Sequence, residues 1–224
     1  MKTVESLSNR SSALARLYDA TWGWVFTATY DRGVKFAEEA GLREVRRRVL
    51  GKASGRTVEL GAGTGANVGL YPPDVSELVL VEPDRHMLRK LREKLFTAAR
   101  PAGVVQATAE NLPFADASFD TAVFALVLCT VPNPTAALAE VARVLKPGGK
   151  LLFIEHVRSR DFRLARWQDR FEKPWRFLGD GCHCNRDTVA TIERSPFVLE
   201  HLIRTRLPKA VPVRRPLVHG SARI

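Results

Sequence analysis

The spacing of hydrophobic residues changes along this chain, and the change separates predicted helices from predicted strands. Over residues 11–50 the apolar positions, Leu14, Leu17 and Tyr18 among them, follow one face of a helix. Farther on, short unbroken apolar runs alternate with longer helical patterns, and such runs are typical of buried strands. The expected strands are residues 57–60, 78–82, 104–107, 121–126 and 150–155, and the expected helices between them are residues 66–71, 85–99 and 134–145.

Strands that alternate with helices of this length predict an α/β fold, in which a parallel sheet is covered by helices on both faces. Pro147-Gly148-Gly149 should end the helix before the fifth strand, because proline cannot continue a helix and glycine permits a tight turn. The expected single domain consists of an N-terminal helical cap at residues 1–50 and a sheet-bearing part at 51–224, which includes a helical insertion at 158–195 and two extended stretches at 198–207 and 213–224.

The composition is that of a single globular domain with a basic surface. The chain has 224 residues, of which 45% are hydrophobic and 26% charged, so it can bury a substantial core. Its net charge of +11 at pH 7 favours anionic partners, and we expect at most weak peripheral contact with membranes. No nucleic-acid-binding motif accompanies the charge, so no nucleic-acid partner is predicted. A solvated basic surface without a partner explains the same charge.

The sequence predicts a cytoplasmic location. The first sixteen residues contain no apolar stretch of the kind found in signal peptides. The longest apolar run, residues 121–131, is shorter than the about 20 residues that a membrane-spanning helix needs. Three cysteines, Cys129, Cys182 and Cys184, do not make a disulfide framework, and a reducing compartment is therefore expected.

A glycine-rich loop, Val58-Glu-Leu-Gly-Ala-Gly-Thr-Gly-Ala-Asn67, lies between the first predicted strand and the helix after it. Open α/β sheets bind ligands at this position. The spacing Gly61-x-Gly63-x-x-Ala66 also fits the loosened dinucleotide fingerprint, whereas a P-loop is excluded because no Gly-Lys-Ser/Thr follows. The loop alone therefore leaves a dinucleotide and other nucleoside ligands open.

Two acidic residues at strand ends narrow this choice. Glu59 lies where a dinucleotide would place its pyrophosphate, and a carboxylate there repels phosphate but attracts an ammonium or sulfonium group. Glu82 ends the second predicted strand, where a carboxylate accepts hydrogen bonds from ribose hydroxyls. S-adenosylmethionine carries both cationic groups and no phosphate, so the two acids favour that cofactor. The alternative for Glu59 is a surface or helix-capping carboxylate.

The chain resembles the class I S-adenosylmethionine-dependent methyltransferases over residues 55–157. The likeness rests on five motifs in order, V-E-L-G-A-G-T-G-A-N, L-V-E-P-D, A-E-N-L-P-F, S-F-D and V-L-K-P-G-G. It implies a doubly wound, mostly parallel sheet of seven strands. It also implies that the glycine loop holds the methionine end of the donor, that Glu82 holds the ribose, and that Leu126 lies near the methyl group. The implied donor-binding residues are Glu59, Gly61, Ala62, Gly63, Gly65, Asn67, Glu82, Pro83, Thr108, Ala109, Glu110 and Leu126.

One departure from the family pattern concerns the adenine. The resemblance implies that Pro83 and the turn at 108–110 flank this ring. Many members place an aspartate at the position of Thr108 to accept a hydrogen bond from the adenine amino group. A threonine hydroxyl can accept as well, but as a neutral group.

A closer likeness covers most of the chain. Its motifs are A-L-V-L-C-T-V at 125–131, I-E-H-V at 154–157, W-Q at 167–168, P-W at 174–175 and D-G-C-H-C-N-R-D-T at 180–188. They resemble the methyltransferase-like seven family of the methyltransferase type 11 group, whose animal members methylate alkyl thiols, and also bacterial phospholipid and quinone methyltransferases. The resemblance implies a small apolar acceptor, with a thiol favoured over a phospholipid amine or a quinone-type ring. The animal proteins carry an apolar amino-terminal membrane anchor, which has no counterpart in this sequence.

His156 and Asp180 are the candidate catalytic residues. His156 follows the fifth predicted strand, and because imidazole titrates near working pH it could act as a general base or orient the acceptor. Asp180 is either a substrate-binding residue or a helix cap. Cys182-His183-Cys184 contains good zinc ligands, but a structural zinc site needs four, so no metal is predicted. Cys182 can equally be a small buried residue.

The expected chemistry is in-line attack of the acceptor on the methyl carbon, during which the charge on sulfur disappears. Exclusion of water and positioning of the reactants would supply most of the acceleration. Aromatic residues of both helical segments are expected to form an apolar lid, although they could simply pack the segments together. These residues are Tyr18, Trp22, Trp24, Trp167, Trp175 and Phe177.

Two functions from other classes stay open. A nicotinamide-dependent reductase could use the same sheet, but Glu59 and the absence of a recognisable Tyr-x-x-x-Lys pair disfavour it. A non-catalytic protein could keep the cofactor as a ligand, because a methyl-transfer site needs few chemical groups.

Overall fold

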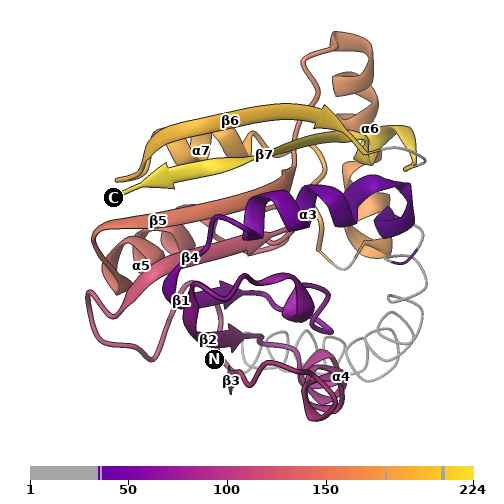
Figure 1. Ribbon diagram of the computed structural model, residues 1–224. Helices are drawn as coiled ribbons and strands as arrows, with labels where there is room; N and C mark the ends of the chain where they lie inside the picture. The colour runs from indigo at the N-terminus through magenta and orange to yellow at the C-terminus, as the bar shows by residue number, and fades with distance from the viewer. Residues whose placement is uncertain (1–34, 36, 180, 208–209) are drawn as a thin grey trace, which may run out of the picture.

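A seven-stranded sheet forms the centre of the computed structural model, which describes residues 35, 37–179, 181–207 and 210–224 (Figure 1). The strands follow the order β3-β2-β1-β4-β5-β7-β6, and all neighbours from β3 to β5 are parallel. The last strand, β7, runs antiparallel to both β5 and β6. The predicted α/β fold with a mostly parallel sheet of seven strands is therefore confirmed. The strands are β1 (Gly55–Leu60), β2 (Val75–Val81), β3 (Gly103–Val105), β4 (Phe119–Ala125), β5 (Leu145–His156), β6 (Val198–Arg206) and β7 (Pro216–Arg223).

Helices cover both faces of this sheet. On one face, α5 and α7 bury Leu138 and Ile192 against a cluster that includes Val58. On the other face, α3 and α4 bury Leu50 and Leu91 against a second cluster, and Figure 1 shows α3 crossing in front of the sheet with α5 and α7 behind it. The helices are α3 (Arg43–Leu50), α4 (Arg85–Phe96), α5 (Pro134–Val144), α6 (Phe162–Leu178) and α7 (Thr188–Glu193), with shorter turns η2 (Glu38–Leu42), η3 (Val68–Leu70) and η4 (Pro212–Arg214).

Short polar side chains set the starts of these helices. Asp84 accepts hydrogen bonds from the amides of His86 and Met87 at the start of α4, and Asp187 accepts one from Ala190 in α7. Asn133 does the same for α5, whose first residue is a proline. Each cap satisfies amides that have no partner inside the helix and contributes about 1 kcal/mol.

Two expected elements differ from the structure. The helix expected at 66–71 is only the short turn η3, because it follows three glycines, at 61, 63 and 65, whose φ angles of 62°, 56° and 80° lie outside the α-helical region. The strand expected at 150–155 begins at Leu145 and continues through the proline and glycines. It does so as an irregular strand, since the β4–β5 register shifts there and the Gly148 amide bonds to the Ile224 carbonyl at 3.2 Å.

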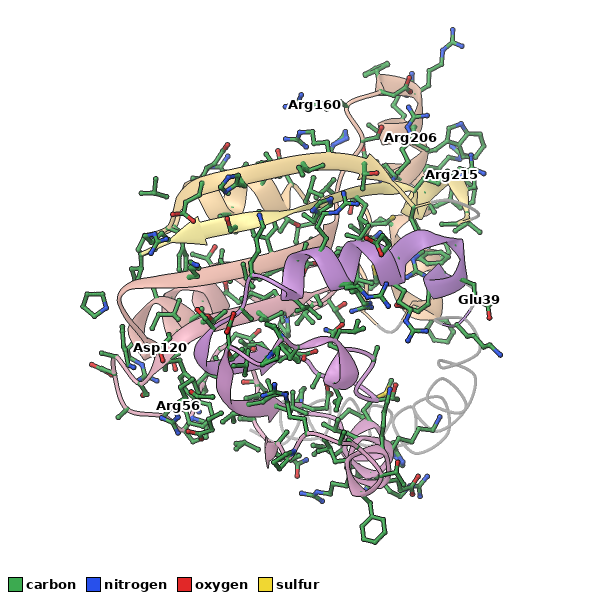
Figure 2. The ribbon with its side chains drawn as sticks, in the orientation of Figure 1. Glu39, Arg56, Asp120, Arg160, Arg206 and Arg215 are labelled. Carbon is green, nitrogen blue, oxygen red and sulfur yellow. The ribbon has the colours of Figure 1, made fainter. Side chains whose placement is uncertain are left out.

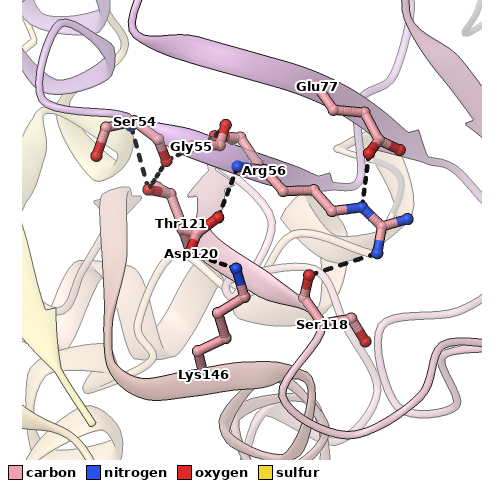
Figure 3. Close-up of polar contacts among 9 residues, drawn as sticks. Ser54, Gly55, Arg56, Glu77, Ser118, Asp120, Thr121 and Lys146 are labelled. Carbon is pink, nitrogen blue, oxygen red and sulfur yellow. Dashed lines mark hydrogen bonds and ion pairs between the residues drawn. The ribbon is translucent and has the colours of Figure 1, made fainter.

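The amino ends of the strands are joined by a polar network (Figure 3). One carboxylate oxygen of Asp120 accepts from the Arg56 amide at 2.8 Å, and the other from Lys146 Nζ at 2.7 Å. Arg56 Nε in turn donates to Glu77 at 2.8 Å. Gly55 is required beside this network, because its φ is 67° and an added Cβ would lie 2.5 Å from an oxygen of Asp120.

Residues 1–34 and 36 of the expected helical cap, including Tyr18, Trp22 and Trp24, lie outside the described residues. Within them, α3 confirms the helical end of this segment and packs against β5 and β7. The boundary at residue 50 stays a prediction. In the part of the chain that the structure describes, no helix combines the length and apolarity needed to cross a bilayer.

Candidate active site

The glycine loop turns from β1 to η3 at the carboxyl edge of the sheet. Gly61 packs closely there, since an added Cβ would lie 2.6 Å from a methyl group of Val127. Gly63 has the same left-handed backbone, but no atom of the described residues lies within 4 Å of an added Cβ there. Its amide donates to Glu82 Oε2 at 2.8 Å, and the Ala62 amide donates to the Val81 carbonyl at 3.0 Å. The loop is thus fastened to the end of β2.

Glu59 lies buried beneath this loop. Asn67 Nδ2 donates to one of its oxygens at 2.8 Å and the Tyr71 hydroxyl to the other at 2.6 Å. Arg46 does not reach the carboxylate directly but donates to Asn67 Oδ1 at 2.9 Å. Burial raises the pKa of Glu59 and, more strongly, that of Tyr71. Sequence patterns gave no sign of the supporting roles of Tyr71 and Arg46.

Glu82 follows β2 and joins three segments of the site. Besides the Gly63 amide, it accepts from the Asp84 amide at 3.0 Å, and its side chain is almost fully buried. The neighbouring Pro83 carbonyl accepts from Gln106 Nε2 at 3.1 Å, which links the end of β2 to the segment after β3. The position fits the implied ribose carboxylate, because backbone donors already hold both oxygens in place.

The turn at residues 108–110 continues this edge beyond β3. The Asn111 amide donates to the Thr108 carbonyl at 3.3 Å and closes the turn, in which Thr108 is exposed and Ala109 buried. Glu110 accepts from the Asn133 amide at 3.1 Å and ties the turn to the start of α5. The implied adenine-flanking residues therefore form an ordered wall with Thr108 on its accessible side.

Leu126, directly after β4, has a strained backbone. Its φ of 67° is unusual for a branched side chain, and such conformations cost about 1–3 kcal/mol and cluster at functional sites. The next three amides hold this turn in place, because Val127 and Leu128 donate to one oxygen of Glu155 at 2.9 Å each and Cys129 donates to the other at 3.2 Å. Burial raises the pKa of Glu155 to about 7 despite these three bonds. Sequence reasoning missed Glu155, although its place in I-E-H-V beside His156 was a signal.

His156 ends β5 and is buried. Its Nε2 lies 3.2 Å from Arg214 Nη2, and since arginine can only donate, Nε2 is the acceptor and the ring is neutral. Burial, with the charge of Arg214, lowers the pKa of His156 to about 3. Nδ1 has no hydrogen-bond partner among the residues that the structure describes. The general-base role stays a prediction, and Asp180 lies outside the described residues.

The segment 182–186 packs against the turn after β4. The His183 amide donates to the Cys129 carbonyl at 2.8 Å, and Arg186 Nη1 donates to the Val131 carbonyl at 2.9 Å. Gln168 of α6, also missed from sequence, is fully buried and bonds to the carbonyls of Val157, Cys184 and Val213. These hydrogen bonds place segment 182–186, which belongs to the closer family likeness, beside the turn that carries Leu126.

Neither the considered zinc site nor the full aromatic lid is assembled in the described part of the chain. His183 Nδ1 lies 3.0 Å from Glu172, and no group of three or more potential ligands is placed to hold a metal among the described residues. Trp167 stacks on Phe171 with ring centroids 5.1 Å apart on an exposed side of α6, and its part in a lid stays a prediction. Trp175 does approach the site, since its ring lies 5.4 Å from the Arg214 guanidinium.

Comparison with known proteins identifies the family. A family model described as a methyltransferase domain matches residues 58–153. Human thiol S-methyltransferase TMT1B is 38% identical over 198 residues, which cover 82% of this chain and 78% of that protein. The chain belongs to this family of class I methyltransferases. The rat protein of the same name is 40% identical over 149 residues, which cover 62% of this chain and only 59% of the rat protein.

A second group of relatives and the solved structures are also methyltransferases. A ubiquinone/menaquinone biosynthesis C-methyltransferase, UbiE, from Shewanella pealeana is 40% identical over 105 residues, 45% of this chain and 42% of its own length. The crystal structure of a SAM-dependent methyltransferase from Thermotoga maritima superposes with a TM-score of 0.67 over 89% of this chain and 97% of its own, at 24% identity. The superposed structure confirms the fold, and the family model with the human relative confirms the enzyme class and its cofactor S-adenosylmethionine, in preference to the nicotinamide-dependent reductase.

The site residues of this methyltransferase fit its donor. Among the described residues no side chain covers Gly63, and Glu82 is held at the end of β2 by two amides. Glu59 is held by two neutral donors rather than by a direct ion pair with Arg46. The assignment of single residues to parts of the donor stays a prediction.

Proposed function

We propose that this methyltransferase transfers its methyl group to the sulfur of a small apolar thiol. The observation that supports the proposal most is the docking of segment 182–186, part of the closer family likeness, on the turn that carries Leu126. Similarity to the thiol S-methyltransferases extends over this acceptor side, whereas a match confined to the glycine loop would indicate only the donor.

In this proposal, different residues of the chain bind the donor and position the reacting groups. The bound donor would supply a methyl group on a positively charged sulfur. Glu82 and the Gly63 backbone would orient the nucleoside, and the turn clamped by Glu155 would place Leu126 against the reacting groups. Packing around this turn excludes water, which strengthens the effect of placement.

Arg214 is the group that would favour the acceptor thiolate. A free thiol has a pKa of about 8.5, so a nearby positive charge need shift it only modestly. Arg214 lies at this edge, where His156 Nε2 accepts its hydrogen bond. In this proposal His156 positions Arg214, because a pKa lowered to about 3 leaves the imidazole a weak base at neutral pH.

A panel of acceptors tests the proposal. Purified protein is incubated with labelled donor and with alkyl thiols, ethanolamine lipids and quinone-type rings, and the products are identified by mass spectrometry. We expect S-methylated thiols and stoichiometric S-adenosylhomocysteine. A protein that binds the donor but methylates none of the thiols would contradict the proposal. Products methylated on ring carbon would instead favour the quinone-type reaction, which similarity to UbiE supports over a shorter part of the chain.

We also propose a cytoplasmic location and weak contact of α6 with anionic membranes. All three cysteines are free thiols, as expected in a reducing compartment. Phe162 and Trp167 are 71% and 54% exposed on α6, between exposed arginines at 163, 166 and 170. Figure 2 shows Arg160, Arg206 and Arg215 at the same end of the molecule. Aromatic side chains among basic ones suit the interface of an anionic bilayer.

Vesicle flotation separates this contact from general stickiness. We expect the protein to float with phosphatidylglycerol vesicles and not with phosphatidylcholine vesicles. The Trp167→Ala, Phe171→Ala double variant should no longer bind phosphatidylglycerol vesicles. Phe96→Ala is the matched control, since Phe96 is 94% exposed on the distant helix α4. Equal flotation of the double variant and the control would refute a docking role for α6.

A further inference from the structure

Two cysteine thiols meet where the acceptor segment docks on the sheet. Cys129 lies in the turn clamped by Glu155, and Cys182 follows α6 directly after Gly181, whose φ is 83°. Their sulfurs are 3.7 Å apart, although 53 residues separate them in sequence. The hydrogen bond from the His183 amide to the Cys129 carbonyl holds the two backbones together beside the thiols. Neither thiol has a part in the methyl transfer described above.

The two thiols are not equivalent. Cys182 keeps 7% of its surface exposed, whereas Cys129 and Cys184 keep 1% and 0%. The hydrogen bond with Cys129 lowers the pKa of Cys182 to about 7, helped by the charges of Arg214 and Arg186. The same contact and burial raise the pKa of Cys129, and burial raises that of Cys184 to about 11. The charge of Glu155 also opposes a negative charge on Cys129.

This asymmetry matches the division of roles in thiol–disulfide exchange. An attacking thiol with a pKa near ambient pH combines a large thiolate fraction with good nucleophilicity. A second thiol within contact distance then resolves the mixed disulfide. Cys182 has the properties of the attacking thiol, and Cys129 those of the resolving one.

We propose that Cys182 and Cys129 form a thiol–disulfide exchange site that accepts low-molecular-weight disulfides. The Cys182 thiolate attacks a disulfide RSSR, the S–S bond breaks, and RS⁻ leaves as a Cys182–S–SR bond forms. Cys129 loses its proton to solvent and attacks the Cys182 sulfur, which releases the second RS⁻ and leaves a Cys129–Cys182 disulfide. The protein dithiol is thereby oxidised by two electrons and RSSR is reduced to two thiols. A soluble thiol or dithiol reductant restores the pair.

The bridge would tie segment 182–186 covalently to the turn after β4. That turn carries Leu126, so the redox state of the pair would reach the acceptor side of the site. The exchange itself does not depend on which acceptor is methylated, and it goes beyond the proposed function.

The test uses the full chain and oxidised glutathione as the probe. Reduced protein is incubated with the probe near pH 7, quenched with an alkylating agent, and mapped by peptide mass spectrometry. We expect a Cys129–Cys182 bridge, two glutathiones released per chain, and reversal by dithiothreitol. Because the larger thiolate fraction of Cys182 outweighs the higher intrinsic nucleophilicity of a Cys184 thiolate, modification at Cys182 should exceed that at Cys184 by about 100-fold.

Three serine variants, checked for folding by circular dichroism, locate the chemistry. Cys129→Ser should stop at a Cys182–glutathione mixed disulfide with one glutathione released, and Cys182→Ser should not react. Cys184→Ser is the matched control and should bridge like the unmodified protein. Absence of the bridge in the unmodified protein, or glutathione on Cys184 at a comparable rate, would overturn the proposal even if a variant fails to fold. Methyl transfer to thiols is measured separately on reduced protein, so failure of one proposal leaves the other intact.

Discussion

The carboxylates at the two ends of the strands of the central sheet are held in opposite ways. At the amino edge, Asp120 and Glu77 pair directly with Lys146 and Arg56, whose side chains are 45% and 38% exposed. The hydrogen bond from Lys146 lowers the pKa of Asp120. At the carboxyl edge, Glu59 and Glu155 are buried, and hydroxyl, amide and backbone donors hold them.

This difference in how the carboxylates are held distinguishes a structural contact from a ligand-binding site. An exposed ion pair cancels its own charge and contributes only about 0–1 kcal/mol, because water and salt screen it. A buried carboxylate held by neutral donors has no opposite charge beside it, and burial destabilises its ionised form, which raises its pKa. The carboxyl edge therefore carries a cost in stability that a cationic ligand can offset, and the amino edge does not.

The largest expected effect is the pH dependence contributed by Glu155. Its pKa is raised from 4.5 to about 7 in the folded state, so its stabilising contribution is present below pH 4.5 and is lost as pH rises through 7. This pKa difference corresponds to a loss of about 3 kcal/mol in the free energy of unfolding. Urea unfolding of Glu155→Gln should lack this decline between pH 4.5 and 7. Asp120→Asn is the control, since a lowered pKa acts in the opposite direction and below pH 4. An unchanged slope in Glu155→Gln would remove the contrast between the edges.

Replacing Glu82 should weaken donor binding next most. Glu82→Ala removes a buried carboxylate that two amides hold in place. Its predicted hydrogen bonds to the ribose are bonds to a charged group, worth about 1.5–3 kcal/mol, so their loss predicts roughly 10–100-fold lower affinity for S-adenosylmethionine. Titration calorimetry measures it. Glu77→Ala, at the amino edge, should bind the donor normally. Unchanged affinity in Glu82→Ala would contradict the ribose assignment.

A smaller effect is expected from His156→Gln. Glutamine can still accept from Arg214, and a histidine whose pKa is about 3 does not titrate in the working range. The rate constant kcat should therefore fall less than about 10-fold, and the pH–rate profile above pH 5 should keep its shape, whereas loss of a general base costs about 100-fold or more. A drop of that size, together with loss of an inflection near neutral pH, would support the predicted general-base role of His156 instead.

The smallest effect is expected at the amino edge. Lys146→Met removes one exposed partner of Asp120, so the free energy of unfolding should fall by less than about 1 kcal/mol. Donor affinity should not change, because the network lies at the opposite ends of the strands. Chemical denaturation and calorimetry on the same sample test both statements. A loss of donor binding would show that the two edges are coupled.

The sequence by itself determined the order of strands and helices, the glycine loop, and the acids at the ends of β1 and β2. These features follow from apolar spacing, from turn chemistry and from motif order, all of which are local in the chain. Local pattern failed at residues 66–71, where the turns at the left-handed glycines 61, 63 and 65 leave only the short turn η3 in place of the helix that the apolar spacing indicated.

Only the tertiary structure decided which residues support those acids and what surrounds the acceptor side. Tyr71 meets Glu59 across 12 residues, Glu155 clamps the β4 turn across 26 to 28, and Cys182 reaches Cys129 across 53. The pKa shifts of Glu155, His156 and Cys182 arise from burial and from charges that folding brings near. Such contacts depend on chain packing in three dimensions, and residue type and spacing carry no record of them.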